Sequence, residues 1–383
     1  MSVIIPTFNR RNLVRLAVES ALSSEDVDVE VVVVDDGSTD GTGGALGAAA
    51  LGPRVRCLRQ ERRGRSAARN LGTAASTGDL VVYLDSDDIL LPGGLRIRRD
   101  VLDADPRIDV VYGDGFYSDE AGTARQRIGL RWPRFEAGRM LETLVLHNIV
   151  TAPHLAMVRR RSLEALGEAP FDESLQGGED ADLWVRLAAR GCRFFGIPDA
   201  VGLYRLHEGN ASSPRSPDRA IREESIRRYR HKVLTADYFG RLPVAVRVEC
   251  VIHCLLTVER GRPEAQARLL SMRPFLDLPE AERARLLYLL GTQHLLEDGE
   301  VALGRQWLRA SARLRPWNAK YRLAAALAHV SPIGLGRIIQ IRRRLAGRRR
   351  GLDPSVVSQW RDGPTPDDAR GRRDPRAPDG ETG

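Results

Sequence analysis

Three carboxylates crowd the end of one predicted strand, in the stretch "VVYLDSDD" that begins at Val81. Asp85, Asp87 and Asp88 lie within four residues, and like charges so close together repel unless a cation lies among them. Hard oxygen ligands suit Mg²⁺ or Mn²⁺, which commonly takes one or two protein carboxylates and completes its shell with substrate phosphates. The alternative interpretation is a turn, because Asp and Ser are residues that turns favour.

A second acidic turn, "DDGSTD", begins at Asp35 and offers Asp35 or Asp36 to the donor and acceptor edge of a nucleobase. The glycines that follow do not form a dinucleotide-binding loop, because Leu46 stands where the third glycine of G-x-G-x-x-G should fall. Four arginines precede the strand that ends in Asp85, and guanidinium groups suit diphosphate oxygens, although surface arginines are usually only solvated. These are Arg62, Arg63, Arg65 and Arg69.

A third acidic site, Glu179 and Asp180, stands in "GGEDADLWVRLAARG" at the start of a predicted helix that Gly191 ends. Two preceding glycines allow the backbone to approach a ligand closely, and a carboxylate held there can serve as a general base. The alternative is that Asp180 is only the N-cap of this helix.

The elements that must position these residues alternate between strand and helix in the first half of the chain. "SVIIP", "VEVVVV", "RVRCL", "DLVVYL" and "HLAMV" predict strands, and "NLVRLAVESALSS" predicts a helix. This alternation predicts an α/β fold with a mainly parallel sheet flanked by helices. Because ligands bind beyond the carboxyl ends of such strands, Pro6-Thr7, Asp36 and Asp85 are expected on one rim.

The second half of the chain has a different composition and charge. Residues 1–210 hold 26 Lys and Arg against 31 Asp and Glu, whereas residues 211–383 hold 33 against 20. From about Ile221 the pattern is helical, and 291–329 is similar to one tetratricopeptide-type hairpin, with Pro316 expected just after its second helix. Residues 351–383, rich in Pro, Gly and charge, are expected to be disordered.

The four cysteines are scattered, so neither a zinc ribbon nor a disulfide framework is expected, and Cys250 and Cys254 are interpreted as the packed face of a helix. "SVIIP" begins at Ser2 without a secretion signal, and no apolar run approaches the length of a spanning helix. We therefore expect a cytoplasmic protein, either soluble or peripheral at the inner face of the membrane.

Seven arginines lie between Arg337 and Arg350, interleaved with Ile338, Ile341 and other apolar residues. This pattern fits either a solvated terminal helix or a surface helix attracted to anionic lipid. A nucleic-acid partner is not expected, because neither interleaved aromatic residues nor a nucleic-acid-binding motif accompanies the charge.

Five motifs taken together resemble the family 2 glycosyltransferases with the GT-A fold. They are, in order, "SVIIPTFNR", "VVVVDDGSTDGT", the stretch that ends in "ARN", "LDSDD" and "GGEDADLWVRLA", and "YRLHEGNAS" also matches the segment that follows in many members. The resemblance covers residues 1–213. It implies a GT-A domain there, and the helical pattern and the composition predict an all-α region over 214–350 and the tail over 351–383.

The resemblance also implies an activity and a site. The family moves a sugar from a nucleotide-diphosphate donor, usually a UDP or dTDP derivative, to an acceptor hydroxyl with inversion. Here the acceptor would be a glycan or a lipid-linked glycan. By position, the nucleotide sugar would contact Pro6, Thr7, Asp36, Arg69 and Asp85. A Mn²⁺ or Mg²⁺ ion would bind Asp87 or Asp88, with His207 near it, although His207 fits equally a residue that fixes a surface loop. Asp180 would be the base, with Glu179 beside it.

Two other classes remain open. The domain fits a protein that binds nucleotide sugars without turnover or serves as an assembly module, although all the motif carboxylates are present. A nucleotidyltransferase shares the rim and the metal, but it usually carries a glycine-rich basic signature near its N-terminus, and "PTFNRRN" is not of that kind.

Overall fold

The computed structural model describes residues 1–24, 27–45, 52–129, 139–207, 210, 216–332 and 334–335. Within them the chain forms two compact units, one from Met1 to Tyr229 and one that begins at Arg230. The predicted disordered tail and the arginines from Arg337 to Arg350 lie outside the described residues.

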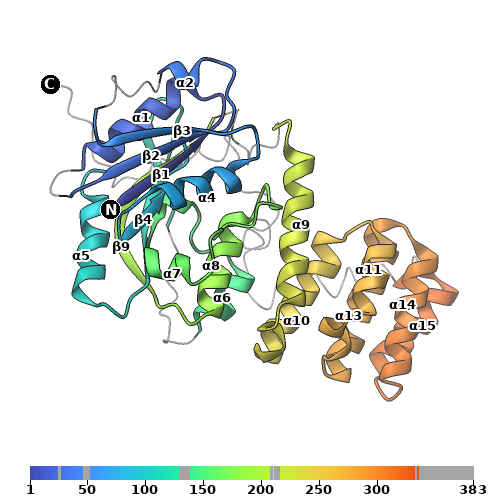
Figure 1. Cartoon of the computed structure of the whole chain (residues 1–383). Helices are drawn as coiled ribbons and strands as arrows, with labels where there is room; N and C mark the ends of the chain where they lie inside the picture. Colours follow the sequence, from blue (N-terminus) through green and yellow to red (C-terminus); the bar gives the residue numbers. More distant parts are fainter. Residues whose placement is uncertain are drawn as a thin grey trace. The chain divides into compact units, whose positions relative to one another are not determined.

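The first unit is a nine-stranded sheet flanked by helices (Figure 1). Eight strands follow the order β3-β2-β1-β4-β8-β6-β9-β5, and β7 pairs with β6. The strands are β1 (Ser2–Thr7), β2 (Glu30–Asp35), β3 (Val55–Arg59), β4 (Leu80–Tyr83), β5 (Ile89–Leu90), β6 (Val110–Ser118), β7 (Ala124–Arg127), β8 (Ala156–Arg159) and β9 (Phe194–Arg205).

The helices of this unit connect and cover these strands, and η1 is a short 3-10 helix. They are α1 (Arg11–Leu22), α2 (Thr42–Ala45), α4 (Arg65–Ala75), α5 (Gly94–Ala104), α6 (Met140–Leu146), η1 (Pro153–Leu155), α7 (Arg160–Glu164), α8 (Glu179–Ala189) and α9 (Arg219–Thr235), which continues into the second unit.

The α/β architecture predicted from the sequence is confirmed, and the sheet is parallel where the candidate residues lie. β3, β2, β1 and β4 are parallel neighbours, whereas β4 pairs with β8 and β8 with β6 in antiparallel fashion. Beyond β4 the sheet is therefore mixed. The strand expected over "HLAMV" begins at Ala156, because His154 and Leu155 belong to η1.

Alternation along the central strands sends side chains to both faces of the sheet. Val3 and Val31 pack in one core cluster with Val14 and Ala17 of α1. Val32 and Val34, one residue out of phase, pack on the other face with Ala68 of α4. Both faces are covered, which explains why these strands read as continuous apolar runs.

Helix α4 lies unusually close to β1 because Gly72 has no side chain. A Cβ atom placed there would lie 2.4 Å from Cγ2 of Ile4 and 3.3 Å from Cγ2 of Val34. Both residues are fully buried and β-branched, so they have little freedom to move away. The close approach fixes the helix that carries Arg69 against the central strands.

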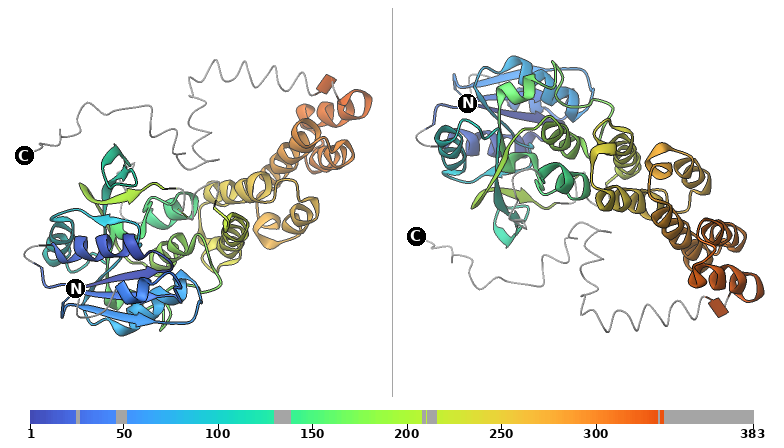
Figure 2. Two further views of the ribbon diagram at one scale, coloured as in Figure 1. Left: turned by 90° about the horizontal axis from the view of Figure 1, so that it is seen from above. Right: turned by 90° about the horizontal axis from the view of Figure 1, so that it is seen from below.

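The second unit is helical, as the sequence predicts. It contains η2 (Phe239–Arg241), α10 (Val244–His253), η3 (Cys254–Val258), α11 (Pro263–Leu270), α12 (Arg273–Leu276), α13 (Glu280–Gln293), η4 (His294–Asp298), α14 (Val301–Leu314) and α15 (Ala319–Val330), of which η2 is a 3-10 helix and η3 and η4 are π-helices (Figure 2). Cys250 and Cys254 are buried among these helices, as expected. Among the described residues, none of the helices has the length and apolar character needed to cross a membrane.

The predicted hairpin needs one correction. Pro316 lies in the turn between α14 and α15, not after the second helix, and the segment from Gly291 also includes the end of α13. Gly291 and Gly304 bring α13 and α14 together, because a Cβ atom on Gly291 would lie 2.9 Å from the Gly304 carbonyl oxygen. α14 is thus packed between α13 and α15.

We predict that Gly72→Ala destabilises the first unit, although alanine favours helix. The added methyl group would overpack the contact with Ile4, at a cost of about 1–3 kcal/mol in the free energy of unfolding. Differential scanning calorimetry of the full chain should show a lower transition temperature for this unit. Ala74→Leu, which adds volume at an exposed position of α4, should change little. Equal transition temperatures for Gly72→Ala and the unmodified protein would contradict this packing.

Candidate active site

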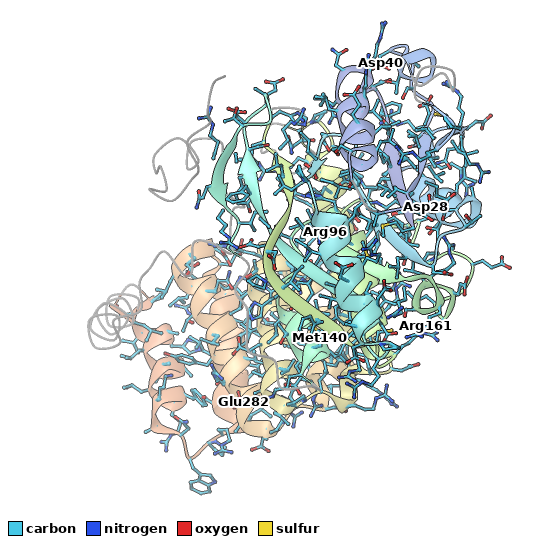
Figure 3. All side chains as sticks on the ribbon, turned by 90° about the vertical axis from the view of Figure 1, so that its left-hand side faces the viewer. Asp28, Asp40, Arg96, Met140, Arg161 and Glu282 are labelled. Atoms are coloured by element: carbon cyan, nitrogen blue, oxygen red, sulfur yellow. The ribbon has the colours of Figure 1, made fainter. Side chains whose placement is uncertain are left out.

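The carboxyl ends of β1, β2 and β4 form one rim of the sheet. Backbone hydrogen bonds tie them together there, from Asp36 N to Thr7 O at 2.9 Å and from Leu84 N to Ile4 O at 2.9 Å. Figure 3 labels Asp28, which precedes the amino end of β2, and Asp40, which follows its carboxyl end, so the two labels show the direction of this strand. The predicted site residues at the ends of these three strands therefore share one edge, as parallel pairing requires.

Asp36 holds the loop that leads into α4. Its Oδ1 accepts hydrogen bonds from Gln60 Nε2 at 2.7 Å and Arg63 N at 2.8 Å, and its Oδ2 accepts one from Gly64 N at 2.9 Å. Gly64 has φ of 93°, a conformation that glycine adopts without strain. Asp36 thus shapes the rim through the chain's own backbone.

Pro6 and Thr7 end β1 and are buried. The hydroxyl oxygen of Thr7 has no hydrogen-bond partner among the described residues, although the side chain is only 3% exposed. A buried hydroxyl without a partner costs free energy unless a ligand or water completes it. It is therefore an unsatisfied polar group at the rim, within the described residues.

Arg69 joins two of the predicted acidic sites. Its guanidinium group donates to Asp85 Oδ1 at 2.6 Å and to Glu179 Oε1 at 2.9 Å, and it is fully buried. Burial alone would lower the pKa of Arg69, but the two carboxylates raise it, so the group stays charged. The end of β4 and the start of α8 thus meet around one cation.

Glu179 is the buried partner in this arrangement. Burial would raise the pKa of its carboxyl group, but Arg65 and Arg69 hold it below the usual range. Gly178, with φ of 77°, is the N-cap of α8, and Glu179 and Asp180 occupy the first helical turn. The interpretation of Asp180 as the N-cap is therefore wrong. Acidic residues in a first turn are stabilised by the helix dipole.

Asp180 is partly exposed and lies next to this buried pair. Its Oδ1 accepts a hydrogen bond from Ala181 N at 2.8 Å, and its Oδ2 lies 3.4 Å from Nδ2 of Asn148, a donor in the segment after α6. Burial raises the pKa of Asp180 to about 6, with the charge of Glu179 adding to the effect. Asp180 is therefore a carboxylate that takes up a proton more readily than an ordinary aspartate.

Asp87 faces a histidine and an arginine. Its Oδ2 lies 3.0 Å from His207 Nε2 and 3.7 Å from Arg10 NH2. Burial would raise the pKa of Asp87, but the hydrogen bond with His207 and the charge of Arg10 hold it below its usual value. Asp87 and His207, predicted as metal neighbours from distant parts of the chain, lie side by side.

Asp88 points away from that pair, into the interior. Its Oδ1 accepts a hydrogen bond from Arg205 N at 2.9 Å, and its Oδ2 lies 3.1 Å from Nδ1 of the fully buried His154. Burial raises the pKa of Asp88 to about 6 against the opposing effect of His154. The structure thus separates Asp88, predicted as a metal ligand, from Asp87 and His207.

The donor set at the rim fits a divalent cation in part. Asp87 and His207 supply one carboxylate and one imidazole, a small set that suits an ion whose other ligands are substrate phosphates and waters. In the portion of the chain that the structure describes, no three acidic, histidine or cysteine residues group together as a metal site. Within the described residues, Asp87 and His207 are therefore the candidate anchor for the ion.

Three residues of this site were not identified from the sequence. Arg10 follows β1 at its carboxyl end, and that position was the available signal. His154 and Asn148 have no comparable signal, because their places depend on folding of the segment between β7 and α8 against the sheet.

Comparison with known proteins agrees with the motifs. The family model "Glycosyl transferase family 2" matches residues 2–167. The chain is 37% identical over 229 residues to the succinoglycan biosynthesis protein ExoO of Rhizobium meliloti, covering 55% of this chain and 62% of that protein. It is 31% identical over 192 residues to a chondroitin synthase of Escherichia coli, covering 50% of this chain and 27% of the synthase.

A solved structure supports the same fold. The crystal structure of S. aureus TarS 1-349 in complex with UDP-GlcNAc matches with a TM-score of 0.52 and 20% identity, over 90% of this chain and 91% of that one. At this level of identity the likeness concerns the fold. The ordered motifs and the family model thus identify residues 2–167 as a match to glycosyl transferase family 2, and the likeness to TarS shows that the first unit has a GT-A-like fold.

Proposed function

We propose that this protein transfers a sugar from a nucleotide-diphosphate sugar to a hydroxyl group of a glycan or lipid-linked glycan, with inversion at the anomeric carbon. The observation that carries the proposal is the bridge from Asp85 through Arg69 to Glu179, beside Asp180. Members of the family place the donor at this rim. The bridge holds Asp180, a carboxylate suited to accept a proton, next to the rim.

The donor would lie along the rim. Its nucleoside would contact Pro6, Thr7 and Asp36, and the Thr7 hydroxyl, which has no hydrogen-bond partner among the described residues, would bond to it. Asp85, held by Arg69, would border the ribose and sugar. TarS was crystallised with UDP-GlcNAc, and ExoO is named for succinoglycan biosynthesis. These relatives support a nucleotide sugar as the donor class and a polysaccharide as the product class.

Asp180 would remove the proton from the acceptor hydroxyl as that oxygen attacks the anomeric carbon. The raised pKa makes its carboxylate a stronger base than an ordinary aspartate, and general-base assistance commonly contributes about 10²- to 10⁴-fold. Glu179 stays ionised on Arg69 and holds the start of α8 in place. One base facing one leaving group supports a single displacement, which inverts the configuration.

A Mn²⁺ or Mg²⁺ ion, when bound, would neutralise charge on the departing diphosphate. Asp87 would hold it, with His207 as the second ligand, because these two side chains lie together at the rim. Asp88 would instead hold the strand end through Arg205 and His154.

We predict that Asp180→Asn lowers kcat by about 10²-fold or more, because an amide cannot accept the proton. The dissociation constant of the donor, measured by titration calorimetry, should stay close to that of the unmodified enzyme. Asp182→Asn is the control, because it makes the same charge change in the same helical turn, at a buried position beside Arg186. Parallel losses of donor affinity and turnover in Asp180→Asn would count against Asp180 as the general base.

The pH dependence provides a second prediction. Asp180 must be ionised to act as a base, so kcat should fall as the pH drops through about 6, the value to which its pKa is raised. An unperturbed aspartate would place this limb near pH 4. A pH–rate profile measures it, and the residual activity of Asp180→Asn should lack the limb. An acid limb that persists unchanged in this variant belongs to another group.

A third prediction concerns the cation. Asp87→Ala should abolish the increase in donor affinity that Mn²⁺ produces, since the carboxylate would be the main protein ligand of the ion. Asp103→Ala removes an exposed carboxylate of α5 and serves as the control. Calorimetric titration of the donor with and without Mn²⁺ measures the effect. An undiminished Mn²⁺ effect in Asp87→Ala would show that the ion binds elsewhere.

A further inference from the structure

The hairpin of α14 and α15 carries the most exposed large apolar side chains of the described residues. Trp317 is 94% exposed, Val330 85% and Leu323 60%, and these are the three most exposed large apolar side chains among the described residues. Single exposed apolar residues are common on protein surfaces, but a group of them on one element marks an interaction site. None of them is among the candidate site residues described above.

Helix α15 has two apolar faces. Tyr321, Ala324 and Ala328 are buried against the rest of the unit. Ala319, Leu323, Ala326 and Val330 are exposed and lie on the opposite side of the helix, within an arc of about 60° at 3.6 residues per turn. Trp317 precedes this stripe in the turn after α14. A surface helix normally has a polar outer face, so this one is built to be covered.

The charge of the hairpin is entirely positive. Residues 301–330 contain six Arg and Lys residues and no Asp or Glu. The longer segment 301–352 contains thirteen Arg and Lys residues and also has no Asp or Glu. Arg305 donates to the Ala328 carbonyl at 2.9 Å and so secures the end of α15. Arg313, Arg315 and Arg322 are exposed beside the turn and the stripe. The surface thus combines an apolar stripe with flanking cations.

We propose that the outer face of α15, with Trp317 in the preceding turn, docks on an anionic lipid bilayer. A second copy of the hairpin would bring like charge against it, and so would residues 337–350 of this chain, which add seven arginines. An anionic surface complements the charge instead. Nucleic acid would satisfy the cations but leave the stripe and Trp317 in water, whereas the headgroup region accepts both.

Sedimentation of the full-length protein with vesicles tests the proposal. Phosphatidylcholine vesicles that contain phosphatidylglycerol should bind the protein, and vesicles of phosphatidylcholine alone should bind it much less. Each basic group near an anionic surface strengthens binding about fivefold, so Arg313→Glu with Arg322→Glu should weaken it at least tenfold. Arg262→Glu with Arg268→Glu makes the same charge change at exposed positions of and beside α11, and it should have the smaller effect.

The apolar contribution has its own readout. Trp317→Ala with Leu323→Ala should weaken binding to the same vesicles severalfold. Brominated lipids should quench tryptophan fluorescence, and Trp317→Phe should remove most of that quenching while it preserves binding. Far-ultraviolet circular dichroism and thermal unfolding report whether each variant remains folded in its helical unit.

Several results would overturn the proposal. One is equal loss of binding in the α11 and hairpin charge variants, and another is quenching that survives in Trp317→Phe. A loss confined to a variant with Arg342→Glu, Arg343→Glu and Arg344→Glu would assign the binding to that later segment. A dimer that dissociates only when Trp317 and Leu323 are replaced would identify a second copy as the occupant, and loss of duplex DNA binding instead of vesicle binding would identify nucleic acid.

Discussion

A single buried guanidinium group holds the candidate active site together. Arg69 is fully buried, and Asp85 and Glu179 compensate its charge from two segments of the chain that lie more than ninety residues apart in sequence. Removing one partner of such an arrangement leaves a buried charge uncompensated, which typically costs about 3–5 kcal/mol. The rim of the sheet and the start of α8 therefore cannot separate without a large loss of stability. This constraint keeps Asp180 beside the rim.

The three crowded aspartates at the end of β4 avoid mutual repulsion by turning to different partners. Asp85 faces Arg69, Asp87 faces His207 and Arg10, and Asp88 enters the interior beside His154 and the Arg205 backbone. Their environments differ accordingly, since the pKa of Asp87 is lowered and that of Asp88 raised to about 6. Residues of one type within four positions can thus take different tasks because each meets a different neighbour.

The helical unit has a different kind of organisation. Small residues allow its helices to pack closely, as where Gly291 meets Gly304. Its last described helix carries apolar side chains on its outer face, with cations beside them. None of the residues proposed to contact the donor or to accept the proton belongs to this surface. The proposed docking would bring the proposed transferase close to lipid-linked acceptors in the membrane.

The sequence by itself determined the strands and helices around the rim, because buried parallel strands and amphipathic helices have distinct periods and because parallel strands end at one edge. It therefore predicted Thr7, Asp36 and Asp85 on a common edge. Only the tertiary structure decided that Asp88 turns inward, that Gly178 and not Asp180 caps α8, and that Arg10, Asn148 and His154 approach the acids. Those outcomes depend on contacts between segments that lie tens of residues apart in sequence. Local residue spacing does not determine which side chains from such segments meet in the folded protein.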